Sequence, residues 1–526
     1  MYHEIEKKIA RNRLLPKAIK DLTINRNNSY ILDIENVRTT YLWAFQYLQE
    51  NNFRLTRELT QKDIYFTIDE WTKIHRQTFD AKDPRQLKIL YLCGPLPSND
   101  FEIFREHGIL GRNVYALESR EKEFNNAIED LNSKNYFINI IHEELSKFLK
   151  TNNIKFDLIY YDACGSFCTG KPDTLNPIIE ILTEERLSDI SALITNFSEV
   201  KESNEFHSGL IASYYLGRYN DLPSSFWDLN ADPAILAFEP ENLKKIVKDN
   251  FEIFYSDFIS RFISDSARYL IPNSRAISFN HLEAEILDRI KMNAKISRAF
   301  KDYEITVDNS DDDYLSSIIR QIDDWDLNPG GYPLYTFLKN IPKLTNEKSF
   351  FDRFNNIKIN NKALKDLIPT ISILNALIEG HQDTINHDFL KTIYGSWFDN
   401  AGGVFCDVPL PNLAINSYLG KYGRPNHINT IKSDRISYKA KENRMFTDYF
   451  LLDNCSEFYN HFPVIKQGLH FFSDIRNQIL IRSMIDRIGR YDWASTSHPY
   501  RGSALAGFYE IPIAKSYEIP DRDYIN

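Results

Sequence analysis

Leu87-Lys-Ile-Leu-Tyr-Leu-Cys93 is a short apolar run that ends at Gly94-Pro95-Leu96-Pro97. A run of this length, bounded by Gly and Pro, is typical of a buried strand that enters a turn. Before it, apolar residues recur at helical spacing from Val37 to Leu48 and again from Ile68 to Gln77, where we expect a helix entered through Thr67. The sequence therefore predicts a helical region over residues 1–84, followed directly by the first strand of a sheet.

The segments after this strand alternate between apolar strand patterns and amphipathic helix patterns. Such alternation predicts parallel βαβ units with right-handed crossovers, and a sheet covered by helices on both faces. The fold class is therefore α/β, with a Rossmann-like sheet. The expected strands are residues 87–93, 113–118, 136–141, 156–162 and 191–197, and the expected helices are residues 100–107, 121–132, 143–150 and 175–185.

The pattern becomes less regular after about residue 200, where helical spacing dominates. We expect one domain over residues 85–300, made of the Rossmann-like unit and a helical extension. A mainly helical C-terminal domain with some strands is expected over residues 301–526. In it, residues 362–380 predict a helix, residues 465–488 predict a long amphipathic helix, and the alternation over residues 503–520 predicts strands.

Composition limits the classes of protein that the chain can belong to. Hydrophobic residues make up 43% of it and charged residues 26%, which predicts a folded globular protein. The five cysteines show no disulfide spacing, no apolar segment near the N-terminus resembles a signal peptide, and no run is long enough to cross a membrane. We therefore expect a cytoplasmic protein with reduced thiols and no membrane contact.

The formal net charge of −10 argues against non-specific coating of nucleic acid, but it leaves room for a local basic surface. Such a surface is one interpretation of Arg476, Arg482, Arg487 and Arg490 in the late amphipathic helix, and a solvated polar face is the other. The expected partners are therefore DNA or RNA at a local basic surface, or another protein.

Four segments occur in an order that resembles the cofactor-site motifs of Rossmann-fold S-adenosylmethionine-dependent methyltransferases. They are Leu87–Gly94, Val114–Glu118, Ile138–Glu144 and Phe156–Phe167, and together they span roughly a fifth of the chain. In that family the loop after the first strand approaches the methionine part of the cofactor. An acidic residue that ends the second strand binds the ribose hydroxyls, and a polar residue after the third strand contacts the adenine.

The resemblance implies that Gly94 lies in the methionine loop, that Glu118 binds the ribose, and that Glu143 or Glu144 stands near the adenine. A carboxylate at the carboxyl end of a strand can accept two hydroxyl donors, which supports Glu118 independently. The alternative is that Glu118 is an exposed residue that begins the next helix, where its charge suits the positive end of the helix dipole.

The first loop departs from the family pattern. In the family this loop is rich in glycine because the backbone passes close to the cofactor. Here the loop Cys93–Asp100 holds one glycine and two prolines, and proline removes N–H donors. Either Ser98, Asn99 or Asp100 replaces the backbone contacts, or the cofactor site is degenerate.

The stretch Asp162-Ala-Cys-Gly-Ser-Phe167 is similar to the fourth-strand loops of methyltransferases that act on nucleobase nitrogens, although both of their prolines are missing. The resemblance implies that Asp162 accepts a hydrogen bond from the target nitrogen and that Phe167 stacks on the base. The alternative is that Asp162 caps a turn and Phe167 fills the core. For Cys164 the alternatives are a nucleophile and a packed free thiol.

Two functions follow from these patterns. The first is an S-adenosylmethionine-dependent methyltransferase that acts on a nucleic-acid base. The second is a catalytically degenerate Rossmann-fold protein that serves as a binding or regulatory subunit of a larger assembly, and it rests on the atypical first loop. A different nucleotide-dependent enzyme is disfavoured because the chain has neither a Gly-x-Gly-x-x-Gly motif nor a phosphate-binding P-loop.

Overall fold

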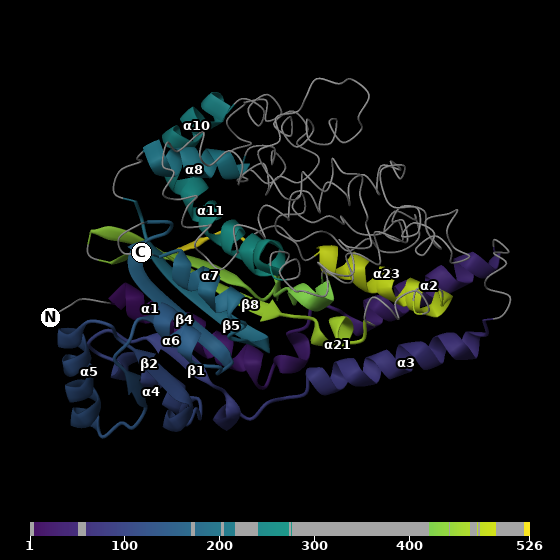
Figure 1. The fold of residues 1–526 in the computed structure, drawn as a ribbon, viewed down its shortest axis with the longest axis horizontal. Coiled ribbons are helices and arrows are strands. Elements are labelled where there is room, and N and C mark those ends of the chain that lie inside the picture. The colour runs from purple at the N-terminus through teal and green to yellow at the C-terminus, as the bar shows by residue number, and fades with distance from the viewer. Residues whose placement is uncertain are drawn as a thin grey trace, which may run out of the picture.

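In the residues that the computed structural model describes, helices cover both faces of one nine-stranded sheet (Figure 1). The expected helix of residues 362–380 and nearly all of the alternating segment 503–520 lie outside the part of the chain that the structure describes. That part consists of residues 5–50, 59–169, 174–200, 205–215, 240–272, 275, 420–440, 442–462, 471, 474–490 and 520–525.

The first five strands form the parallel half of the sheet. They lie in the order β3-β2-β1-β4-β5, and every neighbouring pair among them is parallel. This is the order in which a doubly wound Rossmann sheet begins, so the predicted Rossmann-like α/β fold is confirmed. The strands are β1 (Ile89–Leu92), β2 (Val114–Leu117), β3 (Asn139–Ile141), β4 (Phe156–Ser166) and β5 (Leu187–Ser198).

Four helices connect these strands at the positions that the sequence predicts, with boundaries shifted by at most two residues. They are α4 (Ser98–Glu106), α5 (Glu121–Lys134), α6 (Leu145–Thr151) and α7 (Asn176–Thr183). The helix α5 ends because Asn135 adopts a left-handed conformation with φ of 53°, which asparagine tolerates better than most residues. Each βα unit therefore follows from local sequence signals.

The C-terminal half of the chain continues the same sheet. Its strands are β6 (His427–Ile428), β7 (Asp434–Ala440), β8 (Asn443–Asp453) and β9 (Asp523–Ile525). Strand β8 pairs antiparallel with β5, β7 pairs antiparallel with β8, and β9 pairs parallel with β7. These strands belong to the Rossmann-like sheet, while the expected domain boundary near residue 300 lies outside the described residues, so the domain division remains a prediction.

The two faces of the sheet form two hydrophobic cores, since alternate residues of each strand point to opposite sides. In β1, Ile89 and Tyr91 face one core and Leu90 the other. The first core is closed by α1 (Ile5–Leu22) together with α4 and α5. The second is closed by α6 and α7 together with α8 (Glu205–Tyr215), α10 (Pro240–Asp249) and α11 (Phe251–Asp265).

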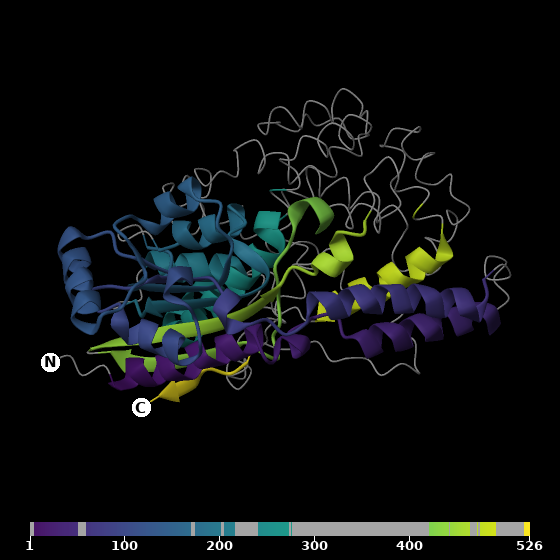
Figure 2. The ribbon, with the colours of Figure 1, turned by 90° about the horizontal axis from the view of Figure 1, so that it is seen from below.

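A group of helices extends from one end of the sheet (Figure 2). The helices α2 (Ile34–Glu50), α3 (Gln61–Thr78) and α23 (Ile475–Arg490) contact one another, and the short α21 (Ser456–Tyr459) contacts α3. The expected start of α3 near Thr67 is wrong by about two turns. The helix begins after Thr60, because Thr60 and Asp63 form a reciprocal capping box.

A buried ion pair fastens the last described residues to the sheet. Arg522, which directly precedes β9, places its Nη1 atom 2.6 Å from Oδ1 of Asp448 in the middle of β8. Asp448 is fully buried, and its Oδ2 atom accepts a hydrogen bond of 2.6 Å from Ser260 of α11. The guanidinium of Arg522 also lies over the Phe446 ring at 5.2 Å. The pair therefore joins β8, α11 and β9.

We expect Arg522→Met to lower the free energy of unfolding by about 3–5 kcal/mol, because it leaves the Asp448 carboxylate buried without its cation. Urea unfolding followed by circular dichroism measures this loss. The double variant Arg522→Met/Asp448→Leu should recover most of it. Lys147→Met is the control, since it removes only an exposed pair with Glu143. A single variant as stable as the wild type would contradict the assignment.

Candidate functional site

The carboxyl ends of the parallel strands bring the predicted site residues to one edge of the sheet. Leu92 of β1 lies opposite Leu117 of β2, so the segments that follow them, including Gly94 and Glu118, begin side by side. The Cys93 amide donates a hydrogen bond of 3.1 Å to the Leu117 carbonyl across this gap. In open α/β sheets, this edge is where ligands bind.

Glu118 is held at this edge by the residues that follow it. Its side chain is 8% exposed, and its Oε1 atom accepts hydrogen bonds from the backbone N–H and the Nε atom of Arg120 at 2.9 and 3.3 Å. Within the described residues, no donor reaches Oε2. The helix α5 begins only at Glu121. Glu118 is therefore neither exposed nor part of that helix, and one of its oxygens remains available to a hydroxyl donor.

The first loop is arranged differently from a glycine-rich loop. Gly94 has a φ of +56°, and no atom lies within 4 Å of the position that a Cβ would take. The first amide of α4, that of Ser98, donates to Asp130 Oδ2 at 2.9 Å, and Lys134 donates to the Ser98 hydroxyl at 2.8 Å. Because side chains of α5 already bind Ser98, this residue does not replace the lost backbone donors. The remaining candidates are Asn99 and Asp100.

Glu143 and Glu144 follow β3 at the same edge, but their contacts are local. Glu143 pairs with Lys147 one turn later at 2.7 Å, and Glu144 is exposed at the N-cap of α6 without a side-chain cap bond. Next to them the His142 ring stacks on Phe124 with a centroid distance of 4.7 Å. The adenine contact remains a prediction for these two residues.

Asp162 lies within strand β4 and not at the start of a loop. The strand continues to Ser166, with a register shift between Asp162 and Ser166 that bulges the chain. The Asp162 carboxylate binds Lys7 through Oδ2 at 2.8 Å and accepts a hydrogen bond from Asn196 Nδ2 at Oδ1, also at 2.8 Å. The longer strand is stabilised by its pairing with β5, which a local pattern does not reveal.

Asn196 connects Asp162 with the C-terminal strands. Its Nδ2 atom donates to the Tyr438 hydroxyl at 2.9 Å, and its Oδ1 atom accepts a hydrogen bond of 2.7 Å from Thr447. Asn196 is fully buried, so this network replaces hydration that the amide would otherwise lose. The two polar residues Thr195 and Asn196 inside an otherwise apolar strand are the sequence feature that could have indicated this network.

Phe167 lies in the core and not at the edge. Its ring is fully buried and packs on Phe197, Phe258 and Phe262 with centroid distances of 4.9, 5.9 and 5.9 Å. The stacking role expected for Phe167 conflicts with this position. Burial among aromatic rings stabilises the chain more than exposure of the ring at the edge would, which favours the core alternative. The side chain of Cys164 lies outside the described residues.

The edge has an acidic character that the first helix partly neutralises. Burial, together with the charges of Glu118 and Asp100, raises the pKa of the Cys93 thiol, so this thiol stays protonated. Arg11 of α1 lies 3.6 Å from Asp100, and Lys7 binds Asp162. Figure 2 shows α1 running along the sheet. Residues 5–22 carry no local sequence signal that would place α1 at this edge.

Comparisons with known proteins give no relative by sequence. No protein-family model matches the chain, and no curated protein matches it. Among solved structures, the plantazolicin methyltransferase BamL, in complex with a triazolic desmethylPZN analog and SAH, is similar at 17% identity with a TM-score of 0.18. The match covers 34% of this chain and 64% of that chain, which is less than two thirds of its length. A likeness this small carries no argument about function.

The sequence also predicts the absence of a membrane span and one interpretation of the late helix as a basic surface. Among the described helices, none has both the length and the apolar character needed to cross a bilayer. Arg476 of α23 forms a two-pronged pair with Asp474, with its Nη2 atom at 2.7 Å. Its charge is therefore already compensated, and the side chains of Arg482, Arg487 and Arg490 lie outside the described residues. A nucleic-acid surface on this helix remains a prediction.

The stability of the folded chain should depend on pH through His207 of α8, whose ring contacts the residue that follows β4. The ring is 3% exposed, and its Nε2 atom lies 3.2 Å from the Phe167 carbonyl oxygen. Burial lowers the pKa of His207 from its ordinary value of 6.5 to about 4, while the bond to Phe167 opposes the shift. Between pH 6.5 and 4 the unfolded chain therefore binds a proton that the folded chain does not, and folding weakens as the pH falls.

We expect this proton to lower the free energy of unfolding by about 3 kcal/mol between pH 6.5 and pH 4. His207→Gln keeps an N–H donor for the Phe167 carbonyl but has no titrating group, so its stability should fall less over the same range. Urea titrations of both proteins at several pH values measure the two slopes. Equal slopes would rule out His207 as the titrating group.

Proposed function

We propose that the chain is an S-adenosylmethionine-dependent methyltransferase with its cofactor site at the carboxyl edge of β1 and β2. The observation that carries the proposal is the Glu118 carboxylate, which lies at the end of β2 beside the β1 loop with one oxygen unbonded in the described residues. In a sheet of this order, an acid at that position suits the ribose hydroxyls of an adenosyl group.

The charge of this edge and the space beside Gly94 support the proposal. S-adenosylmethionine carries a sulfonium and an ammonium, and the acidic edge around Glu118 and Asp100 attracts such cations. The open space beside Gly94 leaves room for a ligand near the backbone. The bound cofactor would supply an activated methyl group. The role of the chain is to bind the ribose through Glu118 and to orient the acceptor.

A nucleic-acid base is the acceptor that we propose, and Asp162 supports it. A carboxylate oxygen in the last part of β4 can accept a hydrogen bond from an amino or ring N–H and so orient the nitrogen toward the methyl group. The Asn196 amide donates a hydrogen bond to the carboxylate, and Lys7 pairs with it at 2.8 Å. Phe167 has no part in this arrangement, so stacking on the base must come from another ring.

The second candidate is a binding or regulatory subunit without catalysis, and one observation favours it. The helix α1 places Lys7 on Asp162 and Arg11 near Asp100, so parts of the chain itself occupy two carboxylates of the edge. In this reading the edge is a structural interface. Methyl transfer by the purified chain alone would exclude it.

We expect Glu118→Gln to weaken the binding of S-adenosylmethionine by about 10- to 100-fold, since a charge-assisted hydrogen bond contributes about 1.5–3 kcal/mol. Isothermal titration calorimetry with S-adenosylhomocysteine and S-adenosylmethionine measures the change. Glu129→Gln, on the exposed side of α5, is the control and should bind as the wild type does. Binding unaffected by Glu118→Gln, or no binding by the wild type, would refute the proposed site.

The Asp162→Asn variant should distinguish an effect on methyl transfer from an effect on cofactor binding. If Asp162 orients the acceptor nitrogen, the rate of methyl transfer to DNA or RNA oligonucleotides should fall by about 100-fold or more, with cofactor affinity nearly unchanged. Asp157→Asn, at the other end of the same strand and paired with Lys82 at 2.7 Å, tests for general effects of losing a buried carboxylate. A transfer rate equal to that of the wild type would eliminate the role of Asp162.

A further inference from the structure

The opposite edge of the sheet holds a second group of chemically reactive side chains. Strand β8 runs antiparallel to β5, so its last residue, Asp453, lies opposite Ile190 near the start of β5. The chain then turns through Asn454 and Cys455 into the short helix α21, which carries Glu457. This turn is therefore separated from the carboxyl edge by the length of β5.

The side chains of Asp453, Cys455 and Glu457 meet inside the protein. Their exposed fractions are 0%, 0% and 3%, and their carboxylate oxygens and sulfur all lie within 4.8 Å of one another. Cys455 has a φ of +48°, and its amide donates to Asp453 Oδ1 at 2.8 Å. Two acids and a thiol at alternate positions of one turn are thus directed to a common point.

Glu457 makes this group unusual among buried side chains. In the described residues, neither of its carboxylate oxygens has a hydrogen-bond partner. Burial of a carboxyl group without a partner costs several kcal/mol, so such groups are rare unless something binds them. Asp453 differs, because the Ile31 and Cys455 amides bind its two oxygens and fix its orientation. A ligand that accepts oxygen and sulfur donors would satisfy Glu457 at this point.

We propose that Asp453, Cys455 and Glu457 bind a zinc ion. Zinc accepts thiolate and carboxylate ligands together, whereas magnesium and calcium avoid sulfur. With Zn–O distances of about 2.0–2.2 Å and a Zn–S distance of about 2.3 Å, tetrahedral ligands lie about 3.5 Å apart. The three donors lie within 4.8 Å of one another, so zinc binding needs them to approach by at most about 1.3 Å.

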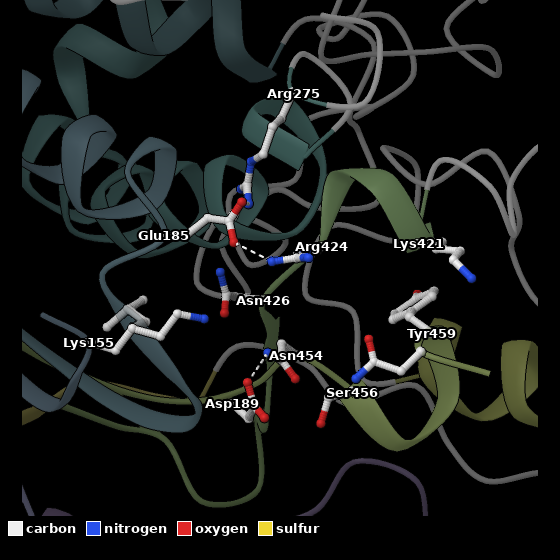
Figure 3. Close-up of a pocket in the computed structure, with 12 residues that line it drawn as sticks. Lys155, Glu185, Asp189, Arg275, Lys421, Arg424, Asn426, Asn454, Ser456 and Tyr459 are labelled. Carbon is white, nitrogen blue, oxygen red and sulfur yellow. Dashed lines mark hydrogen bonds and ion pairs between the residues drawn. The ribbon is translucent and has the colours of Figure 1, made fainter. Parts of the chain in front are cut away.

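A pocket of about 170 Å³ lies next to this turn (Figure 3). Asn454, Ser456 and Tyr459 line it, and these residues flank the proposed ligands along the chain. On its far side Glu185 bridges Arg275 and Arg424 at 3.1 and 2.9 Å. With three protein ligands, a tetrahedral zinc ion would take one further ligand, such as a water molecule.

Zinc binding by the full-length chain tests the proposal. The protein is stripped with a chelator, and Zn²⁺ alone is returned in competition with a chromophoric chelator. We expect one zinc ion per chain and a higher melting temperature with zinc, because the ion binds only the folded state. Co²⁺ in place of Zn²⁺ should give the near-ultraviolet absorption of a cobalt–thiolate bond, which reports sulfur ligation directly.

Variants identify the ligands. Glu457→Gln keeps the shape of the side chain and removes a buried acid, so it should fold and yet bind zinc at least about tenfold more weakly. Cys455→Ser should abolish the cobalt–thiolate absorption, and Cys168→Ser, at a buried cysteine far along the chain, should retain it. A wild-type chain that binds no zinc, or a Glu457→Gln variant that binds it as tightly as the wild type, overturns the proposal.

Discussion

The antiparallel pairing of β5 with β8 is the interaction on which the rest of the structure depends. Nine residue pairs, from Ile190↔Asp453 to Ser198↔Met445, join two segments that lie some 250 positions apart in the chain. The pairing places β7 and β9 in the sheet, gives α11 a surface to pack on, and delivers Thr447 to the network around Asn196. Without it the parallel half would expose β5 as a bare edge, which is a site of aggregation in other proteins.

Buried charge lies beside this pairing, on the face of the sheet that α11 covers. Arg522 and Asp448 form one ion pair there, and Arg435 pairs with Asp257 of α11 at 2.8 Å. Buried ion pairs contribute little net stability compared with apolar side chains of the same size, but breaking one is costly. Here these ion pairs help to specify the register of β8, because a wrong register would leave Asp448 without its arginine. In a similar way, the hydrogen bond from Asn196 holds the Asp162 carboxylate in position at the carboxyl edge.

The sheet separates two chemical environments. At its carboxyl edge Glu118, Asp100 and Asp162 form an acidic rim that α1 approaches with Lys7 and Arg11. At the opposite edge Asp453, Cys455 and Glu457 converge in the interior. The strands between them are rigid and buried on both faces, so each edge can hold its side chains in fixed positions independently of the other.

The sequence by itself determined the parallel half of the fold, because each strand and helix from Leu87 to Phe197 is specified by its own periodicity and turn residues. It also placed Glu118 directly after β2, since that position follows from local patterns, whereas Asp162 lies inside β4, which is longer than its local pattern indicates. Only the tertiary structure decided the rest. The places of β8 and α1, the burial of Phe167, the role of Asn196 and the meeting of Asp453 with Cys455 and Glu457 all depend on packing between distant segments. Such contacts leave no periodic signal in a single sequence, because they are selected by the fit of whole surfaces and not by neighbours along the chain.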